Sequence, residues 1–139
     1  MPRIIPVDFE GPHKTAICSI RETVFVQEQG VPAELEYDGL DASAMHVLAC
    51  VDDQPVGTGR ILSDGHIGRI AVLNSHRGQG IGARIVQALT EQAAAAGHQR
   101  VYLGAQLHAT SFYERLGFTP YGETFMDAGI EHIHMEKHL

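Results

Sequence analysis

A glycine-rich turn between an apolar strand and an amphipathic stretch has the residue types needed to bind an anion. Gly78, Gly80 and Gly82 fall within five positions, directly after Arg77. Glycine lets a large group approach the backbone closely, and a helix start directs free N–H groups and the positive end of its dipole toward negative charge. The turn therefore predicts a site for a small molecule that carries phosphate, with Arg77 as a cation at its entrance.

The sequence on either side predicts the elements that position this turn. A strand that begins at Ile67 ends in Ile70, Ala71 and Val72. After the turn, apolar residues recur at the spacing of one helical face, and Gly97 is suited to cap the end of that helix. The apolar residues of this face are Ile81, Ile85, Leu89 and Ala93.

Three kinds of phosphate site compete for the turn. A Walker A loop needs a Lys directly after its last glycine, and none follows here. A dinucleotide fingerprint is matched in form by residues 78–83, but it also expects an acidic residue after the next strand, which instead ends in Gln106. The third pattern, Arg-x-x-Gly-x-Gly, is filled by Arg77, Gly80 and Gly82.

This third pattern, placed after a strand that ends in Ile-Ala-Val, resembles the acetyl-coenzyme A loop of the GNAT acetyltransferase superfamily. Residues 109–118 resemble the later motif of the family, with the aromatic pair Phe112 and Tyr113 followed by Gly-Phe. The order and separation of the two blocks also fit. Further stretches are similar to the small bacterial ElaA/YjcF-like branch, namely residues 24–29, 38–46, 105–106 and 122–132.

The resemblance implies an α/β fold, with a mixed six- to seven-stranded sheet, helices on both faces, and fourth and fifth strands that run parallel and splay apart. Residue patterning predicts a first helix over residues 13–29, and strands over residues 3–9, 44–51, 56–62, 67–72, 100–105, 119–126 and 130–139. A helix connects residues 67–72 to residues 100–105, which favours a parallel arrangement of those two strands. We expect a ligand slot where they part.

The resemblance also implies acetyl-coenzyme A as cosubstrate and acyl transfer to an acceptor, most often an amine. By analogy with the family, the Val72 N–H polarises the thioester carbonyl and Tyr113 gives a proton to the departing thiolate. Two adjacent helical residues rarely face the same core stripe, so Tyr113 is expected to face the cleft while Phe112 packs.

The base that takes the proton of the amine stays open at this point. Glu28 and His134 are put forward as candidates, and histidine titrates near neutral pH without much tuning. Deprotonation through water, with no dedicated base, is a further alternative. The other candidates are His46, His108, Glu123 and His132.

The coenzyme is expected to contact the strand end, the turn and the later aromatic motif. The strand should pair with the pantetheine arm as an added strand would, and N–H groups of the turn should hold the pyrophosphate. Arg84 is either a further phosphate ligand or an exposed helix residue. The expected contact residues are Ile70, Ala71, Val72, Arg77, Gly78, Gln79, Gly80, Ile81, Gly82, Ala83, Gln106, Ser111, Phe112 and Tyr113.

The acidic segment of residues 31–43 has two interpretations. It is either a solvated loop or a wall of the acceptor pocket that attracts a cationic amine, and the family resemblance favours the wall. Its acids are Glu34, Glu36, Asp38 and Asp41.

Composition and charge argue against several kinds of partner and cofactor. The 139 residues are expected to form a single domain over residues 1–139, and the formal charge of −7 argues against nucleic acid as a partner. No apolar run approaches a membrane span of about 20 residues, and the first residues lack the core of a signal peptide, so we expect a cytoplasmic protein without a membrane partner. Cys18 and Cys50 lack metal-ligand spacing, which favours free thiols and no metal.

The sequence thus predicts an acetyl-coenzyme A-dependent N-acyltransferase that acts in a ternary complex on a primary amine of a small molecule or peptide. The alternative is a non-catalytic module that binds and senses acyl-coenzyme A. A monomer and a homodimer both remain open.

Overall fold

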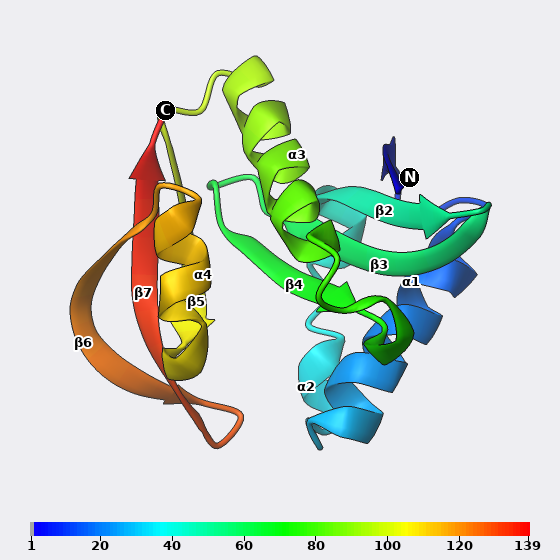
Figure 1. Cartoon of the computed structure of the whole chain (residues 1–139), viewed down its shortest axis with the longest axis horizontal. Coiled ribbons are helices and arrows are strands. Elements are labelled where there is room, and N and C mark those ends of the chain that lie inside the picture. Colours follow the sequence, from blue (N-terminus) through cyan, green and yellow to red (C-terminus); the bar gives the residue numbers. More distant parts are fainter. Residues whose placement is uncertain (1) are drawn as a thin grey trace.

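Seven strands form two antiparallel sheets that diverge from one shared edge (Figure 1). The structure, a computed structural model, describes residues 2–139. The first sheet has β1 (Arg3–Val7), β2 (Met45–Val51), β3 (Gln54–Ile61) and β4 (Ile67–Val72), in that order. The second has β5 (Arg100–Gln106), β6 (Thr119–Asp127) and β7 (Ile130–His138), with β7 in the middle. The α/β class is as expected, but the expected single sheet is divided in two.

The two sheets touch where β4 begins beside β5. His66 and Tyr102 form an isolated parallel bridge, and the Tyr102 N–H donates to the Gly65 carbonyl at 3.0 Å. Gly65 has φ +92°, and a Cβ there would lie 2.7 Å from the Arg100 carbonyl oxygen. A glycine is therefore needed for this close approach. Beyond the bridge β4 and β5 separate, as expected for the splayed strands.

Helices cover both faces of the first sheet. Val47 and Ala49 of β2 belong to the core under α3 (Ile81–Ala95), whereas Leu48 and Cys50 belong to the core under α1 (Lys14–Arg21). Alternate residues of a strand point to opposite faces, so α1 and α3 lie on opposite sides of the sheet. The remaining helices are α2 (Ala33–Glu36) and α4 (Thr110–Arg115), with 3₁₀ turns at Asp41–Ser43, Asn74–His76 and Leu107–Ala109.

The long helix α3 follows the sequence expectation closely. Its apolar face is fully buried, and Ile85 and Leu89 are both 0% exposed. Gly97 has φ +90°, the His98 N–H donates to the Ala93 carbonyl at 3.0 Å, and the Gly97 N–H donates to the carbonyl three residues before it. This is a Schellman motif, which satisfies the last carbonyls of the helix.

The expected helix over residues 13–29 changes its geometry half-way. α1 ends at Arg21, and Glu22–Glu28 form a π-helix in which each turn holds an additional residue. The Gln29 N–H accordingly donates to the Val24 carbonyl, five residues earlier, at 3.2 Å. The spacing of apolar residues could not reveal this change, because only Val24 is buried within the π segment and one residue does not define a period.

Candidate active site

The divergence of β4 and β5 leaves a cavity of about 400 Å³ between the two sheets. We call it the inter-sheet cleft. It is lined by β4 on one side, by β5 and β7 on the other, and by α4 at one end. Its lining includes Phe25, Arg60, His66, Arg69, Ile70, Gln106, Tyr113, Phe125, His132 and His134.

A second cavity of about 480 Å³ lies at the glycine turn. We call it the turn cavity. Val72 from the end of β4 and Phe112 from α4 line it together with the start of α3. The other lining residues are His76, Arg77, Gly78, Gly80, Ile81, Gly82, Ala83, Arg115 and Leu116. Because Ile70 and Tyr113 line the inter-sheet cleft, the two cavities adjoin along the same strand and the same helix.

The start of α3 offers free backbone donors to the turn cavity. Gly80 is the N-cap with φ +78°, a left-handed conformation that glycine adopts without strain, and no side chain caps this end. The N–H groups of Ile81, Gly82 and Ala83 therefore have no partner within the helix. Such an end, with the positive pole of a 15-residue helix behind it, is suited to an anion.

The end of β4 presents a further backbone donor. The Leu73 N–H donates to the Val56 carbonyl at 2.8 Å, and Val72 is paired with Gly57. Hydrogen-bonded and non-hydrogen-bonded pairs alternate in an antiparallel ladder, so Val72 directs its N–H and its carbonyl away from β3. Earlier in β4 the register shifts, and Arg69 there has φ +53°. This bulge is the irregularity expected where the strands part.

Arg77 joins the turn to two other segments. Its Nε donates to the Val72 carbonyl at 2.9 Å, and its Nη2 donates to Glu28 Oε2 at 2.7 Å. The side chain therefore bridges the turn, the end of β4 and the π-helix. Arg84 also binds protein, since its Nη1 donates to the Pro2 carbonyl at 2.8 Å.

Tyr113 and Phe112 face different cavities. Phe112 lines the turn cavity and packs toward Gly82, whereas Tyr113 lines the inter-sheet cleft. Their rings meet edge to face, with centroids 5.0 Å apart. Burial raises the pKa of Tyr113 to about 12, so its phenol stays protonated at neutral pH and is able to donate a proton.

An aromatic and imidazole stack forms the β7 wall of the inter-sheet cleft. Phe125 of β6 stacks on His134 with centroids 4.3 Å apart and on His132 at 5.7 Å. His132 Nδ1 lies 2.7 Å from the Ile130 carbonyl oxygen, which fixes its ring. His134 also stacks on Tyr121 at 5.5 Å.

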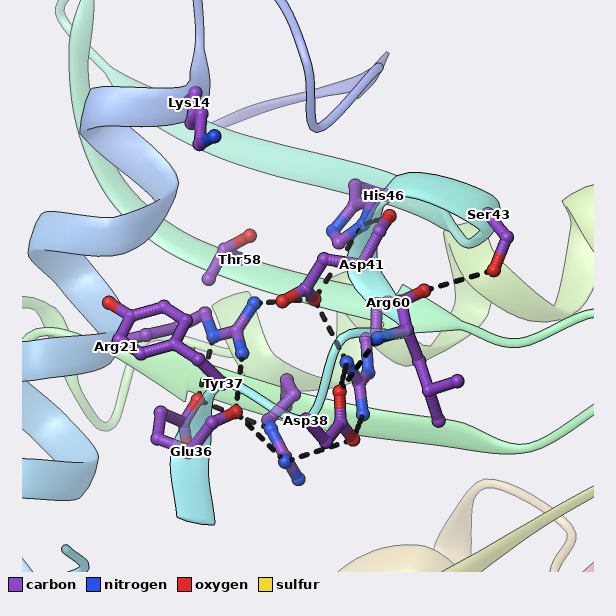
Figure 2. Close-up of polar contacts among 12 residues, drawn as sticks. Lys14, Arg21, Glu36, Tyr37, Asp38, Asp41, Ser43, His46, Thr58 and Arg60 are labelled. Atoms are coloured by element: carbon purple, nitrogen blue, oxygen red, sulfur yellow. Dashed lines mark hydrogen bonds and ion pairs between the residues drawn. The ribbon is translucent and has the colours of Figure 1, made fainter. Parts of the chain in front are cut away.

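The acidic segment folds onto three arginines (Figure 2). Arg21 donates to Glu36 and to Asp41, both at 2.7 Å, and Arg60 donates to Asp38 at 2.6 Å and to Asp41 at 2.9 Å. Its hydrogen bonds to Arg60 hold the pKa of Asp38 well below its usual range. Burial opposes ionisation of Asp41, but its hydrogen bonds and charge interactions with Arg21 and Arg60 together outweigh burial and lower its pKa.

Arg69 of β4 completes this arginine–carboxylate cluster. Its Nε lies 3.2 Å from Glu36 Oε2, and its Nη2 lies 3.4 Å from Asp38 Oδ2. The three carboxylates are thus matched by three arginines. Three of the four acids expected to attract a cationic amine are thus paired with arginines, whereas the fourth, Glu34, is exposed. The segment is still a wall of the cleft, through Leu35 and Glu36.

Comparison with known proteins identifies the family. Residues 13–139 match the family described as acetyltransferase (GNAT) domain. The chain belongs to this family. It is 43% identical over 122 residues to the uncharacterized N-acetyltransferase YjcF of Bacillus subtilis. The matched region covers 85% of this chain and 87% of that protein.

Two crystal structures show the same GNAT fold. The crystal structure of Escherichia coli ElaA superposes with a TM-score of 0.88 at 30% identity, covering 97% of this chain and 99% of that one. An acyl-CoA N-acyltransferase from Pseudomonas aeruginosa gives a TM-score of 0.87 at 30% identity and covers 99% of both chains. The chain is therefore an N-acyltransferase of a family that uses acetyl-coenzyme A.

Most of the coenzyme contacts expected from the GNAT motifs lie at the two cavities. The expected residues at the turn cavity are Val72, Arg77, Gly78, Gly80, Ile81, Gly82, Ala83 and Phe112, and those at the inter-sheet cleft are Ile70, Gln106 and Tyr113. The side chain of Ile81 is 1% exposed, so only its backbone is available. Ala71, Gln79 and Ser111 line neither cavity.

The candidate bases are scattered. His132 and His134 lie in the inter-sheet cleft, whereas Glu28 is exposed and paired with Arg77. His46 is 1% exposed, with Nε2 2.9 Å from the Asp41 carbonyl oxygen. The last two candidates, His108 and Glu123, are exposed and line neither cavity.

Three arginines that line the two cavities were not predicted as site residues from the sequence. Arg115 lines the turn cavity, and the helical spacing from Phe112 could have indicated it, since residues three apart share a face. Arg60 and Arg69 line the inter-sheet cleft, and nothing in their local sequence points there.

The described part of the chain has neither a cluster of metal ligands nor a membrane-spanning helix. Residues 2–139 contain no group of three or more His, Cys, Asp or Glu placed to hold a metal ion. Among the helices of the same residues, none has both the length and the apolar character to cross a membrane.

Proposed function

We propose that this protein transfers the acetyl group of acetyl-coenzyme A to a primary amine by direct attack in a ternary complex. The observation that carries the proposal is that the turn cavity and the inter-sheet cleft adjoin at the end of β4. One cavity offers free N–H groups for the coenzyme and the other has room for an acceptor. A donor and an acceptor held there would meet beside Val72 and Tyr113.

The turn is suited to the diphosphate of the coenzyme. The N–H groups of Ile81, Gly82 and Ala83 are the donors, and Arg115 adds a cation. Arg77 is held by Glu28 and the Val72 carbonyl, so it acts by fixing the turn as well as through its charge. The end of β4 before Val72 would pair with the pantetheine arm as with an added strand, and the outward Val72 N–H would be left for the thioester carbonyl.

The chemical step forms a C–N bond and breaks a C–S bond. The amine nitrogen attacks the thioester carbon, and the negative charge that develops on the carbonyl oxygen is stabilised by the Val72 N–H. When the C–S bond breaks, Tyr113 gives its phenolic proton to the sulfur. The proton of the amine leaves through His134 or through water in the inter-sheet cleft. Glu28 has no place in this path, because it lies outside the cleft.

The first test is a calorimetric titration with acetyl-coenzyme A, NAD and ATP side by side, followed by a thiol-release assay across a panel of amines. We expect binding of acetyl-coenzyme A alone and release of free thiol with some amines. Binding without thiol release across the panel would contradict the proposed reaction and favour an acyl-coenzyme A sensor. Binding of NAD but not of acetyl-coenzyme A would contradict the assignment of the turn.

A further inference from the structure

The wall of the inter-sheet cleft that belongs to the first sheet carries two cations, one buried and one half-buried. Arg60 comes from β3 and Arg69 from β4, and both line the cleft. Both contact carboxylates of the arginine–carboxylate cluster, and the contacts of Arg60 with Asp38 and Asp41 are drawn in Figure 2. The surface of this acidic protein would favour cationic ligands, so two arginines in the cleft wall call for a separate explanation.

Arg60 has one hydrogen-bond donor that the protein leaves unused. The residue is 4% exposed, and its Nη1 and Nη2 are taken by Asp38 and Asp41. Its buried Nε has no hydrogen-bond partner among residues 2–139. This atom is itself shielded from solvent, so Arg60 would act on a ligand through its charge and not through a direct hydrogen bond.

The charge of Arg69 is only partly offset by its carboxylate neighbours, and its backbone conformation is strained. Burial outweighs the attraction of Glu36 and lowers the pKa of Arg69, whereas hydrogen bonds to carboxylates raise the pKa values of Arg21 and Arg60 against the effect of burial. The φ of +53° at Arg69 is strained for a residue with a side chain, and such strain concentrates at ligand sites. An anion beside Arg69 would stabilise its charge.

The rest of the cleft offers an anion little repulsion. Glu36 lines the cleft, but its carboxylate accepts the hydrogen bond of Arg21 Nε at 2.7 Å and faces Arg69 Nε at 3.2 Å. Asp127 is the other carboxylate of the lining, and it is exposed at the end of β6. The wall opposite Arg60 and Arg69 carries the imidazoles of His132 and His134.

From these contacts we propose that the acceptor amine carries an oxyanion, either a carboxylate or a phosphate, which binds the guanidinium of Arg69 and is also attracted by the charge of Arg60. The inference rests on the proposed acyl transfer and names its substrate class. Arg69 precedes Val72 by three residues, which is about 10 Å of strand. A group bound by Arg69 while the amine reacts beside Val72 therefore belongs to a small molecule of amino-acid or dipeptide size.

Matched acceptors test the proposal. Each set shares one side chain and one amine and differs in a single group: the free amino acid, its carboxamide, the decarboxylated amine and the aminophosphonate. We expect kcat/KM to be about 10- to 100-fold higher for the two acids than for the neutral members, as for a charge-assisted hydrogen bond. The carboxylate and phosphonate members separate the two oxyanions. Spermidine represents the opposite class, a polycation.

The Arg69→Gln variant should remove most of this preference and leave acetyl-coenzyme A affinity unchanged, because the turn cavity is separate. Arg3→Gln makes the same chemical change in an exposed residue, with a 3.6 Å ion pair to Asp53, and should keep the preference. Equal kcat/KM for acid and carboxamide in the wild type would overturn the proposal. A preference for spermidine, or an acid preference that persists in Arg69→Gln, would do the same.

A binding measurement separates this proposal from the proposed reaction. The protein saturated with coenzyme A is titrated with the N-acetylated acid and the N-acetylated carboxamide of one set. We expect the acid alone to bind in the wild type, with affinity lost in Arg69→Gln. If no amine is acetylated but the acid binds in this way, the reaction fails and the oxyanion site stands. If neither compound binds, the site is refuted.

Discussion

Arg77 and Glu28, 49 residues apart in the chain, form an ion pair with 2.7 Å between Nη2 and Oε2. The pair fastens the glycine turn to the end of the π-helix and takes Glu28 out of the inter-sheet cleft. Both side chains are partly exposed, at 41% and 34%, so the pair stabilises the fold by only about 0–1 kcal/mol. Its consequence is for the proposed coenzyme site, because a phosphate bound there would compete with Glu28 for Arg77.

We therefore predict that Glu28→Gln binds acetyl-coenzyme A as tightly as the wild type or about two- to fivefold more tightly, with the larger gain at low salt. The kcat should stay within about threefold, since a lost general base costs about 10²- to 10⁴-fold. Calorimetry and thiol release measure the two quantities. Glu10→Gln, which breaks an exposed pair with Lys14, is the matched control. A hundredfold loss of kcat with unchanged affinity would make Glu28 the base.

Tyr113→Phe should lower kcat by about 100-fold or more and leave the dissociation constant of acetyl-coenzyme A within twofold. The phenol lines the inter-sheet cleft and not the turn cavity, which separates the two effects. With its pKa raised by burial to about 12, the phenol remains protonated at both pH 7 and pH 9. The fold-decrease in kcat caused by the substitution should therefore be equal at the two pH values. Thiol-release kinetics at both pH values measure it.

Tyr37→Phe is the control for this variant, because its hydroxyl lies 3.3 Å from Glu22 and its ring lines neither cavity. It should retain full kcat. If Tyr113→Phe also turned over normally, proton donation to the thiolate would have to come from water.

Gly82→Ala should weaken coenzyme binding without harming the fold. Gly82 does not have a positive φ, and a Cβ there would lie 3.6 Å from the Phe112 ring and 3.9 Å from Val72, which is ordinary contact. In a helix, alanine is favoured over glycine by about 1 kcal/mol, so the melting temperature should stay equal or rise. The added methyl would occupy the turn cavity, and we expect the dissociation constant to rise at least about tenfold.

Calorimetry and thermal melting together test the Gly82 prediction. Gly11→Ala is the matched control, since its Cβ would have only the Asp8 carbonyl oxygen within 4 Å, at 3.9 Å. Wild-type affinity in Gly82→Ala would mean that the coenzyme does not approach this part of the backbone.

Local patterns in the sequence predicted the parts of the site that local physics determines. The apolar face of α3, its Gly97 cap and the division of Phe112 and Tyr113 between two surroundings all follow from helical periodicity and from the conformational freedom of glycine. The order of strand, turn and helix followed in the same way. These features depend on residues within a few positions of one another.

What the sequence did not reveal depends on long-range pairing. Arg60 and Asp38 are 22 residues apart, and an acidic loop looks the same in sequence whether its carboxylates meet water or arginine. The contact of Arg77 with Glu28 has the same character. The π-helix was missed for a different reason, because Val24 is its only buried residue and a single buried position cannot distinguish π from α spacing.

The arginine–carboxylate cluster also predicts how stability depends on pH. The native pKa values of Asp38 and Asp41 lie below the ordinary value of 3.8, so the unfolded chain binds more protons as the pH falls through that value. Their contribution is complete above pH 4 to 5 and is lost on further acidification. Urea denaturation should therefore show a falling free energy of unfolding below pH 4.

His46 lies against the Asp41 carbonyl, and it should lower the free energy of unfolding over a higher pH range than the carboxylates do. Burial lowers its pKa below the ordinary 6.5, so below that value the unfolded chain is protonated while native His46 stays neutral. The free energy of unfolding should fall from pH 7 to pH 5, by at most about 1.4 kcal/mol per pH unit for one histidine. Burial lowers the pKa of His66 as well, so part of the slope should remain without His46.

Urea denaturation of His46→Gln at pH 7, 6 and 5 tests this, because glutamine can still donate to the Asp41 carbonyl but does not titrate. We expect a shallower decrease than in the wild type, whatever the absolute stability of the variant. His108→Gln changes an exposed histidine and should keep the wild-type slope. An unchanged slope in His46→Gln would mean that His46 is protonated equally in the folded and unfolded states, and that the acid sensitivity of the cluster comes from its carboxylates alone.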